Sequence, residues 1–225
     1  MNTLITLITA GITFGTVLMY GTLGEILTEK SGNLNLGVEG IMYMGGAFGL
    51  AGAFYYEKAA GASVIGPVAI IIALLCAFLA GCAASAIYSF LTITLRTNQN
   101  VTGLALSIFG TGVGQFVGEL MRVKEGGYVA LSNGLKNAFA ASVLPDFLVK
   151  IPIIGPILFS HTIFFYMALI LAVAMWYYLS KTRSGMYLTA VGESPSTSDA
   201  AGINITLYKY LATIIGGGIS AIGGM

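Results

Sequence analysis

Two short polar stretches of this 225-residue chain carry side chains that could bind a polar molecule. The stretch GEILTEKSGNLNLGVEGIM, residues 24–42, places amides at Asn33 and Asn35 among several carboxylates. The stretch RTNQNVTGLAL, residues 96–106, holds Gln99 between two further amides. Amide side chains both donate and accept hydrogen bonds, so they suit sugar hydroxyls and nucleobase edges. The residue types therefore indicate binding chemistry.

Sequence motifs for catalysis, nucleotide binding and metal binding are missing. No lysine follows a glycine, so the phosphate-binding pattern G-x-x-x-x-G-K-[ST] does not occur. The single histidine, His161, has no HExxH or Ser-His-Asp arrangement around it and is typical of an interfacial anchor. Cys76 and Cys82 lie in an apolar run without metal or disulfide spacing. We therefore expect neither catalysis nor a bound metal or cofactor in this chain.

The composition of the chain indicates a membrane protein. Hydrophobic residues make up 56% of the chain and charged residues 8%, against about 25% charged residues in an ordinary soluble domain. A soluble chain would need more polar residues to cover its surface. The net charge of +1 gives no indication of a nucleic-acid partner.

Apolar runs long enough to cross a bilayer, about 20 residues each, predict about six membrane helices. The first run lacks a positively charged region before it, which favours a membrane helix over a signal peptide. The second is short and glycine-rich, which indicates a broken or closely packed helix. We expect an all-α, polytopic bundle that forms a single transmembrane domain of residues 1–225. The predicted spans lie near residues 4–20, 41–55, 63–95, 101–120, 161–180 and 207–225.

Basic and aromatic residues at the ends of the spans predict the orientation. Lys181 and Arg183 follow an aromatic belt at 176–178, as expected where a helix enters the cytoplasm. A loop at about 181–205 is therefore predicted to be cytoplasmic, and the N-terminus and the region 121–160 to be extracytoplasmic. Basic residues in that region count against this orientation: Arg122, Lys124, Lys136 and Lys150.

Glycines at helical spacing predict close contacts between the spans. Small residues let helix backbones approach each other in lipid, where helix association has no hydrophobic driving force. We therefore expect a tightly packed bundle and not a lone anchor. The glycines occur in three sets: Gly45 and Gly49; Gly110, Gly114 and Gly118; and Gly216, Gly217 and Gly218.

Each polar stretch allows two interpretations. A charged side chain costs about 2.5–3.5 kcal/mol at the centre of a membrane, so Glu25 and Glu39 lie at the surface or line a wet cavity. Residues 24–42 form either a connecting loop with a turn at 31–32 or a broken helix whose amides hold a polar substrate, as in transporters. In the second stretch, Gln99 favours a substrate pathway and its neighbours favour a helix cap.

A third polar stretch, RSGMYLTAVGESPSTSDAAGI at 183–203, predicts a short helix. Ser194 suits its N-cap, Pro195 its first position and Gly202 a left-handed end. A helix of about seven residues is marginal alone in water, where about 12–15 residues are needed. The segment is therefore expected to dock against another protein or against its own bundle. Two acidic side chains could pair with a partner: Glu193 and Asp199.

The three stretches resemble segments of one protein family, in the same order along the chain. The 183–203 stretch resembles the cytoplasmic coupling segment of permease subunits of ABC importers for branched-chain amino acids, ribose and nucleosides, with the pattern R-x-G-x-x-x-x-A-V-G-x-x-P-x-A-A-x-x-A-G-I. The runs SGNLNLGVEGIM and NQNVTGLAL are similar to segments of the nucleoside or simple-sugar branch of that group. Matching residues of the coupling segment are Arg183, Gly185, Ala190, Val191, Gly192, Pro195, Ala201, Gly202 and Ile203.

This resemblance implies a multi-pass permease subunit of the cell (inner) membrane that performs no chemistry itself. It implies pairing with a second permease subunit and with ABC ATPase subunits that use ATP, and delivery of the solute by a binding lipoprotein or periplasmic protein. It implies an alternating-access pathway lined by Asn33, Asn35, Glu39 and Gln99. The residues implied in coupling to the ATPase are Arg183, Gly185, Gly192, Glu193, Pro195, Asp199 and Gly202.

Departures from the family pattern leave other functions open. Thr197 and Ser198 stand where the pattern has paired alanines, and the chain ends within a predicted span, so we expect a truncated family member. The residues also allow an ion-coupled secondary transporter with Glu25 or Glu39 as its proton or sodium site. A non-transporting structural membrane subunit is the third possibility. The amides do not distinguish nucleosides from simple sugars.

Overall fold

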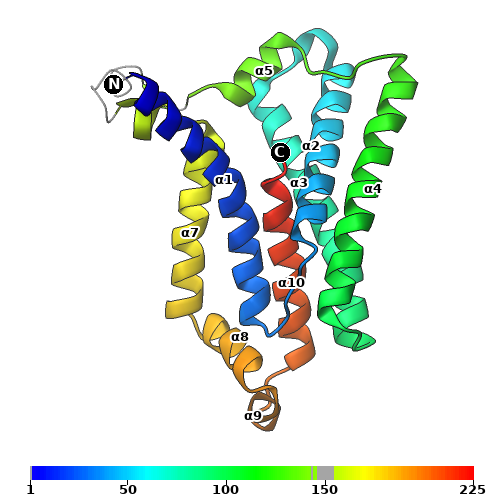
Figure 1. The fold of residues 1–225 in the computed structure, drawn as a ribbon, viewed down its shortest axis with the longest axis vertical. Coiled ribbons are helices and arrows are strands. Elements are labelled where there is room, and N and C mark those ends of the chain that lie inside the picture. The colour runs from blue at the N-terminus through cyan, green and yellow to red at the C-terminus, as the bar shows by residue number, and fades with distance from the viewer. Residues whose placement is uncertain (1, 143, 146–154) are drawn as a thin grey trace.

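A computed structural model describes residues 2–142, 144–145 and 155–225 (Figure 1). Within these residues the secondary structure is helical, apart from an isolated β-bridge between Ser142 and Thr162. The predicted all-α fold is confirmed. The elements are α1 (Asn2–Lys30), α2 (Val38–Ala60), η1 (Gly61–Ser63), α3 (Gly66–Ser89), η2 (Phe90–Thr94), α4 (Gln99–Glu125), α5 (Asn133–Ala140), η3 (Gly155–Phe159), α7 (Ile163–Lys181), α8 (Arg183–Glu193), α9 (Pro195–Ala200) and α10 (Ile205–Ile222).

Five of the described helices are long and apolar enough to cross a membrane. They are α1, α3 together with η2, α4, α7 and α10, and they coincide with five of the predicted spans. The sixth predicted span, 41–55, lies within α2, which is not among the five. The helix α2 packs against α3, α4 and α10, and its glycines and the charged residues near its two ends lower its mean hydropathy. The chain is thus a multi-pass membrane protein.

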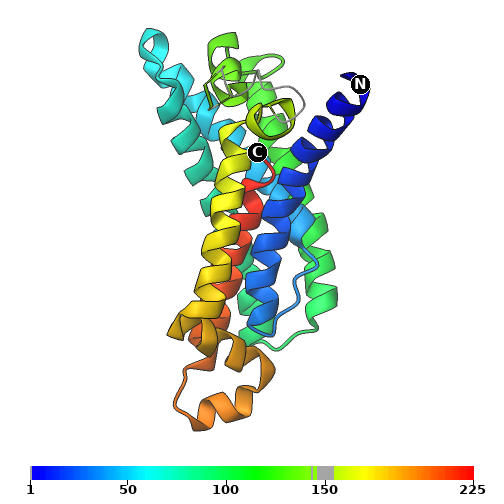
Figure 2. The ribbon, with the colours of Figure 1, turned by 90° about the vertical axis from the view of Figure 1, so that its left-hand side faces the viewer.

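The long helices cross the bundle in alternating directions, and α8 and α9 project from one end (Figure 2). The central helix, α10, contacts α1, α2 and α3. At the opposite end from α8 and α9 lies α5. The predicted loop 181–205 and the described part of the region 121–160 therefore lie at opposite ends of the bundle. Lys150 lies outside the described residues. The side of the membrane that each end faces stays a prediction.

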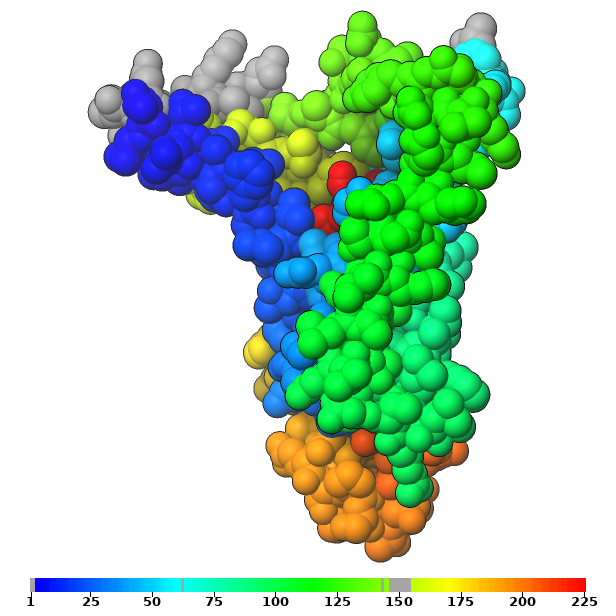
Figure 3. All heavy atoms as spheres, turned by 45° about the vertical axis from the view of Figure 1, so that its right-hand side comes forward, coloured from blue at the N-terminus to red at the C-terminus, as the bar shows by residue number. Residues whose placement is uncertain are grey.

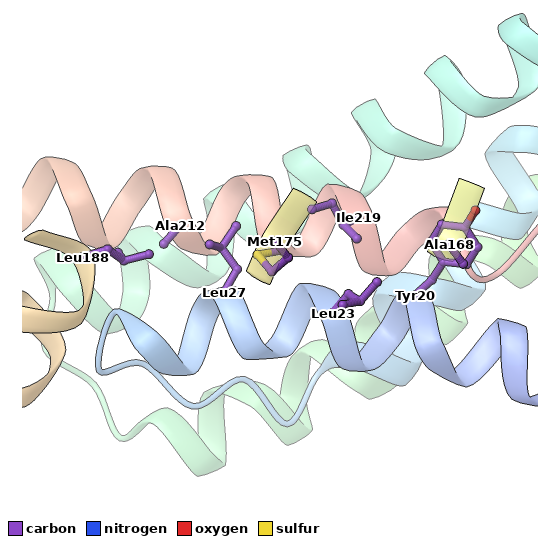
Figure 4. Close-up of a cluster of buried hydrophobic side chains, with 8 residues drawn as sticks. All are labelled: Tyr20, Leu23, Leu27, Ala168, Met175, Leu188, Ala212 and Ile219. Carbon is purple, nitrogen blue, oxygen red and sulfur yellow. The ribbon is translucent and has the colours of Figure 1, made fainter. Parts of the chain in front are cut away.

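A cluster of buried apolar side chains joins α1, α7, α8 and α10 (Figure 4). Within it, the Tyr20 hydroxyl also donates a hydrogen bond of 2.8 Å to the Phe164 carbonyl oxygen. Because Leu188 belongs to this cluster, α8 is fixed to the membrane helices by apolar packing and is not a loose loop. The members are Tyr20, Leu23, Leu27, Ala168, Met175, Leu188, Ala212 and Ile219.

Most of the predicted glycine sets lie where helices approach each other closely. A Cβ added to Gly216 would meet the Gly24 carbonyl oxygen of α1, and one on Gly217 would overlap the Ser85 hydroxyl of α3. The sets at 45–49 and 110–114 contact neighbouring helices in the same way. Gly118 differs, because a Cβ there would meet nothing within 4 Å. The prediction of close packing is confirmed except at this residue.

Two matched alanine substitutions test this packing. In Gly24→Ala the new methyl group would overlap the Ser220 hydroxyl and the Gly216 carbonyl oxygen, and such overpacking costs about 1–3 kcal/mol. Gly118→Ala places the same group in open space. We expect a lower free energy of unfolding for Gly24→Ala and no loss for Gly118→Ala, measured by denaturant unfolding in detergent. Equal stability of the two variants would contradict the packing described.

Candidate functional site

The segment 31–37 turns back into the bundle from the end of α1, so α2 begins inside the bundle (Figure 1). Gly32 closes α1 with a φ of 81°, and its N–H donates a hydrogen bond of 2.8 Å to the Glu29 carbonyl oxygen. A positive φ of this kind favours glycine. The break between the helices thus leaves a short stretch of irregular backbone within the membrane bundle.

Asn33 is buried and links this segment to α10. Its side chain is 2% exposed. Its Nδ2 donates hydrogen bonds to Thr213 Oγ1, at 3.1 Å, and to Ser31 Oγ, at 3.3 Å. The amide therefore holds the segment against α10. Thr213 was not predicted, since an isolated threonine in an apolar span gives no signal of such a role.

Gln99 and Tyr88 bind the backbone of the same segment at Leu34. The Leu34 N–H donates to Gln99 Oε1 at 2.8 Å. The Tyr88 hydroxyl donates to the Leu34 carbonyl oxygen at 2.5 Å. The backbone of Leu34 is thus hydrogen-bonded by one side chain of α4 and one of α3. Tyr88 is fully buried and was also missed, because a tyrosine inside an apolar run resembles ordinary core.

Asn35 and Glu25 satisfy the next backbone groups. The Asn35 N–H donates to Glu25 Oε1 at 2.8 Å. The Asn35 Oδ1 accepts the Gly37 N–H at 2.9 Å, just before α2 begins. At the mouth of α4, Asn98 accepts the N–H groups of residues 100 and 101, so the predicted cap is confirmed for Asn98. The structure thus brings Asn33, Asn35 and Gln99 together around one segment.

A polar cavity of about 700 Å³ lies beside this segment, next to α9. It is bordered by the starts of α4 and α10, by η2 and by the link after α9. We call it the α9-side cavity. Two of the predicted pathway residues line it, together with charged and polar neighbours: Asn33, Gln99, Arg96, Asp199, Asn204 and Lys209.

Glu39 lies apart from the other predicted pathway residues. It is exposed in the first turn of α2 and lines an open groove of about 730 Å³ between α1 and α4 (Figure 3). We call it the α1–α4 groove. The chain from Asn33 to Glu39 therefore runs from the edge of the α9-side cavity to the edge of this groove. Other lining residues of the groove are Leu18, Tyr43, Leu50, Gly114 and Met225.

The predicted coupling segment contains two helices where one was expected. The 11-residue α8 precedes α9, which has six residues, close to the predicted seven. Pro195 opens α9, and Gly202 follows it with a φ of 77°, as predicted. Ser194 stands at the N-cap, but its hydroxyl bonds Thr197 Oγ1 at 2.8 Å and not the backbone. The helix α8 was not predicted, because the glycines at 185 and 192 lower the helix propensity of its sequence.

Two glycines of α8 lie against other backbone. A Cβ on Gly185 would overlap the Tyr178 carbonyl oxygen at the end of α7. A Cβ on Gly192 would overlap the Lys30 carbonyl oxygen at the end of α1. These glycines are required for close approach, and they place α8 at the junction of α1 and α7.

Most side chains of α9 face away from the bundle. Within α9, Ser198 is buried. Of the predicted coupling residues, Gly185 is buried and Gly192 half-buried, whereas the others are exposed: Arg183, Glu193, Pro195, Asp199 and Gly202. The helix contacts α8 and α10. It therefore packs on its own chain through one side and presents the other side outward, and docking of another protein against that outward side stays a prediction.

The relatives found by comparison with known proteins include three ABC transporter permeases. The chain is 33% identical over 218 residues to a putative glucose ABC transporter permease of Haloferax volcanii, and this match covers 97% of the chain and 61% of that protein. It is 30% identical over 222 residues to a guanosine ABC transporter permease of Bacillus subtilis, with 97% of the chain and 65% of that protein covered. It is 29% identical over 227 residues to a nucleoside ABC transporter permease of Lactococcus lactis, with 100% and 67% covered.

The chain thus spans about two thirds of the length of these relatives. No solved structure matches it. Residues 7–225 match the family described as "Branched-chain amino acid transport system / permease component". This match covers nearly the whole chain, including all three polar stretches. The chain therefore belongs to this family of transport permeases.

Proposed function

We propose that the chain is a transmembrane permease subunit of an ATP-driven ABC importer for nucleosides or simple sugars. The solute crosses by alternating access, and the 183–203 segment couples this movement to a separate ATPase. A second permease subunit and a solute-binding lipoprotein or periplasmic protein complete the importer. The permease itself uses no cofactor, since ATP is hydrolysed in the partner.

The observation that carries this proposal is the position of residues 33–39 between the α9-side cavity and the α1–α4 groove. One of its ends lines the α9-side cavity and the other lines the α1–α4 groove. Irregular backbone inside a membrane is tolerated where protein or a wet cavity surrounds it. A barrier of this kind, opened on alternate sides, gives a polar solute a path without a continuous pore. Asn33, Asn35, Glu39 and Gln99 are the proposed lining.

The substrate class is supported by the relatives and by the side chains of the pathway. The relatives are named for glucose, guanosine and nucleosides. Amides and a carboxylate recognise hydroxyl groups and base edges by hydrogen bonds. The proposed coupling residues extend from the start of α8 to the turn after α9, and the exposed side of α9 is the proposed docking surface. These coupling residues are Arg183, Gly185, Gly192, Glu193, Pro195, Asp199 and Gly202.

The source of energy separates this proposal from an ion-coupled carrier that uses Glu25 or Glu39. We expect uptake of labelled guanosine or glucose into sealed vesicles to stop when ATP is depleted while the ion gradients are held constant. The same uptake should survive collapse of the ion gradients and the substitution Glu25→Gln at saturating ATP. Uptake that continues without ATP would exclude the proposed function.

The hydrogen bond from the Leu34 N–H to Gln99 provides a second test. Gln99→Leu removes the acceptor with little change in volume, and a lost neutral hydrogen bond costs about 1 kcal/mol. We expect initial uptake rates to fall about fivefold. Asn100→Leu is the matched control, because Asn100 is exposed and contributes only its backbone N–H to the Asn98 cap. Equal uptake by the two variants would remove Gln99 from the pathway.

The exposed side of α9 gives a third test. The double variant Pro195→Gly and Asp199→Arg loosens the first turn of α9 and reverses its charge, so we expect the ATPase subunits no longer to co-purify. Lys124→Glu, an exposed charge reversal near the other end of the bundle, should leave co-purification intact. Retention of the ATPase by the double variant would place the docking surface elsewhere.

A further inference from the structure

The end of α8 lies directly against the turn that closes α1. A Cβ on Gly192 would overlap the Lys30 carbonyl oxygen and stand 3.0 Å from the Gly32 nitrogen. A Cβ on Gly32 would in turn stand 3.2 Å from the Gly192 Cα. The two backbones therefore touch with no side chain between them. A displacement of α8 toward α1 cannot be absorbed there by a change of rotamer.

Gly32 is the first point at which such a displacement enters the 31–37 segment. Its left-handed conformation ends α1, and the next residue, Asn33, points its N–H back to the Thr28 carbonyl oxygen at 3.4 Å. An L-residue would be strained at this φ. Gly32 thus joins the end of α1 to the irregular backbone in a conformation that other residues do not adopt readily.

The opposite side of α8 packs firmly against the membrane helices. Leu188 and Val191 are 1% and 0% exposed, and Leu188 packs in the buried cluster with Leu27 and Ala212 (Figure 4). Close-packed interiors transmit a shift and do not yield to it. A single residue, Ser194, separates α8 from α9, and its N–H bonds the Ala190 carbonyl oxygen at 2.9 Å. Force applied to α9 therefore reaches Gly192 through one short connection.

Beyond Gly32, four helices hold the segment through side chains. Glu25 of α1, Tyr88 of α3, Gln99 of α4 and Thr213 of α10 each bond a residue between 33 and 35. A shift of the backbone at Gly32 changes the geometry of these hydrogen bonds together. A few residues of backbone thus connect the contact at Gly192 to the part of the 31–37 segment that lies between the α9-side cavity and the α1–α4 groove.

We propose that the backbone contact between Gly192 and Gly32 transmits the movement of α8 and α9 to the 31–37 segment, which makes Gly192 a positioning residue of transport. This inference rests on the function proposed above. Gly192 touches no solute, and its role is to keep α8 and the end of α1 in direct contact.

The test compares the unsubstituted protein with Gly192→Ala, each assembled in proteoliposomes with the ATPase, the second permease subunit and the solute-binding protein. The new methyl group forces α8 away from Lys30, so we expect ATP hydrolysis to persist while uptake of labelled guanosine or glucose falls about tenfold or more, within the usual range of coupling free energies. Gly112→Ala of α4 is the control, since Gly112 is exposed and its new methyl group meets open space, and it should change neither rate. Full uptake by Gly192→Ala, or loss of ATPase binding, would overturn the inference.

A second measurement covers the case in which Gly192→Ala does not fold. Leu34→Cys places a thiol at a partly exposed position of the segment, in a protein whose native cysteines carry Cys76→Ala and Cys82→Ala. We expect ATP to change the rate of its alkylation by a maleimide, and Gly192→Ala, where folded, to abolish the change. A rate independent of ATP overturns the inference even where uptake is normal. Absence of ATP-driven uptake by the unsubstituted protein would instead contradict the proposed function.

Discussion

The rest of the structure depends on how the irregular backbone of residues 31–37 is satisfied inside a membrane bundle. Backbone N–H and C=O groups cannot stay unpaired in hydrocarbon. Here side chains complete the pairing: Gln99 and Tyr88 at Leu34, and Glu25 at the Asn35 N–H. Because these side chains come from different helices, the position of the segment depends on the arrangement of the whole bundle. A structural need of the backbone thus creates the element that, in the proposed mechanism, responds to helix movement.

Glycine packing around α10 makes this arrangement possible. Gly216 and Gly217 bring α1 and α3 so close to α10 that polar side chains from each reach the same short segment. The same principle, at Gly192, brings α8 to the end of α1. Small residues therefore determine both the density of the bundle and the points at which one helix acts on another. Large apolar side chains, such as Leu188, fix α8 in place.

The sequence allowed prediction of the helical bundle, because apolar runs and glycine spacing depend on local composition. It also pointed to Asn33, Asn35 and Gln99 as polar residues that need a partner or a ligand in an apolar chain, and their place in a solute pathway stays a prediction. It could not show that these amides meet around one segment or that Glu39 faces a different cavity, because both depend on helix packing. Tyr88, Thr213 and the contact of Gly32 with Gly192 gave no local signal. The helix α8 was missed because its stability comes from tertiary burial of Leu188 and Val191 and not from propensity.

The central proposal is that the 31–37 segment moves when the proposed ATPase partner moves α8. The most direct measurement is a pair of cryo-electron microscopy structures of the assembled importer, one without nucleotide and one with ATP trapped. In both, we expect Gly192 to remain against the Lys30 carbonyl oxygen, while Leu34 shifts relative to Gln99 and the access of the two cavities changes. A segment that keeps the same position relative to α4 in both states would contradict the account.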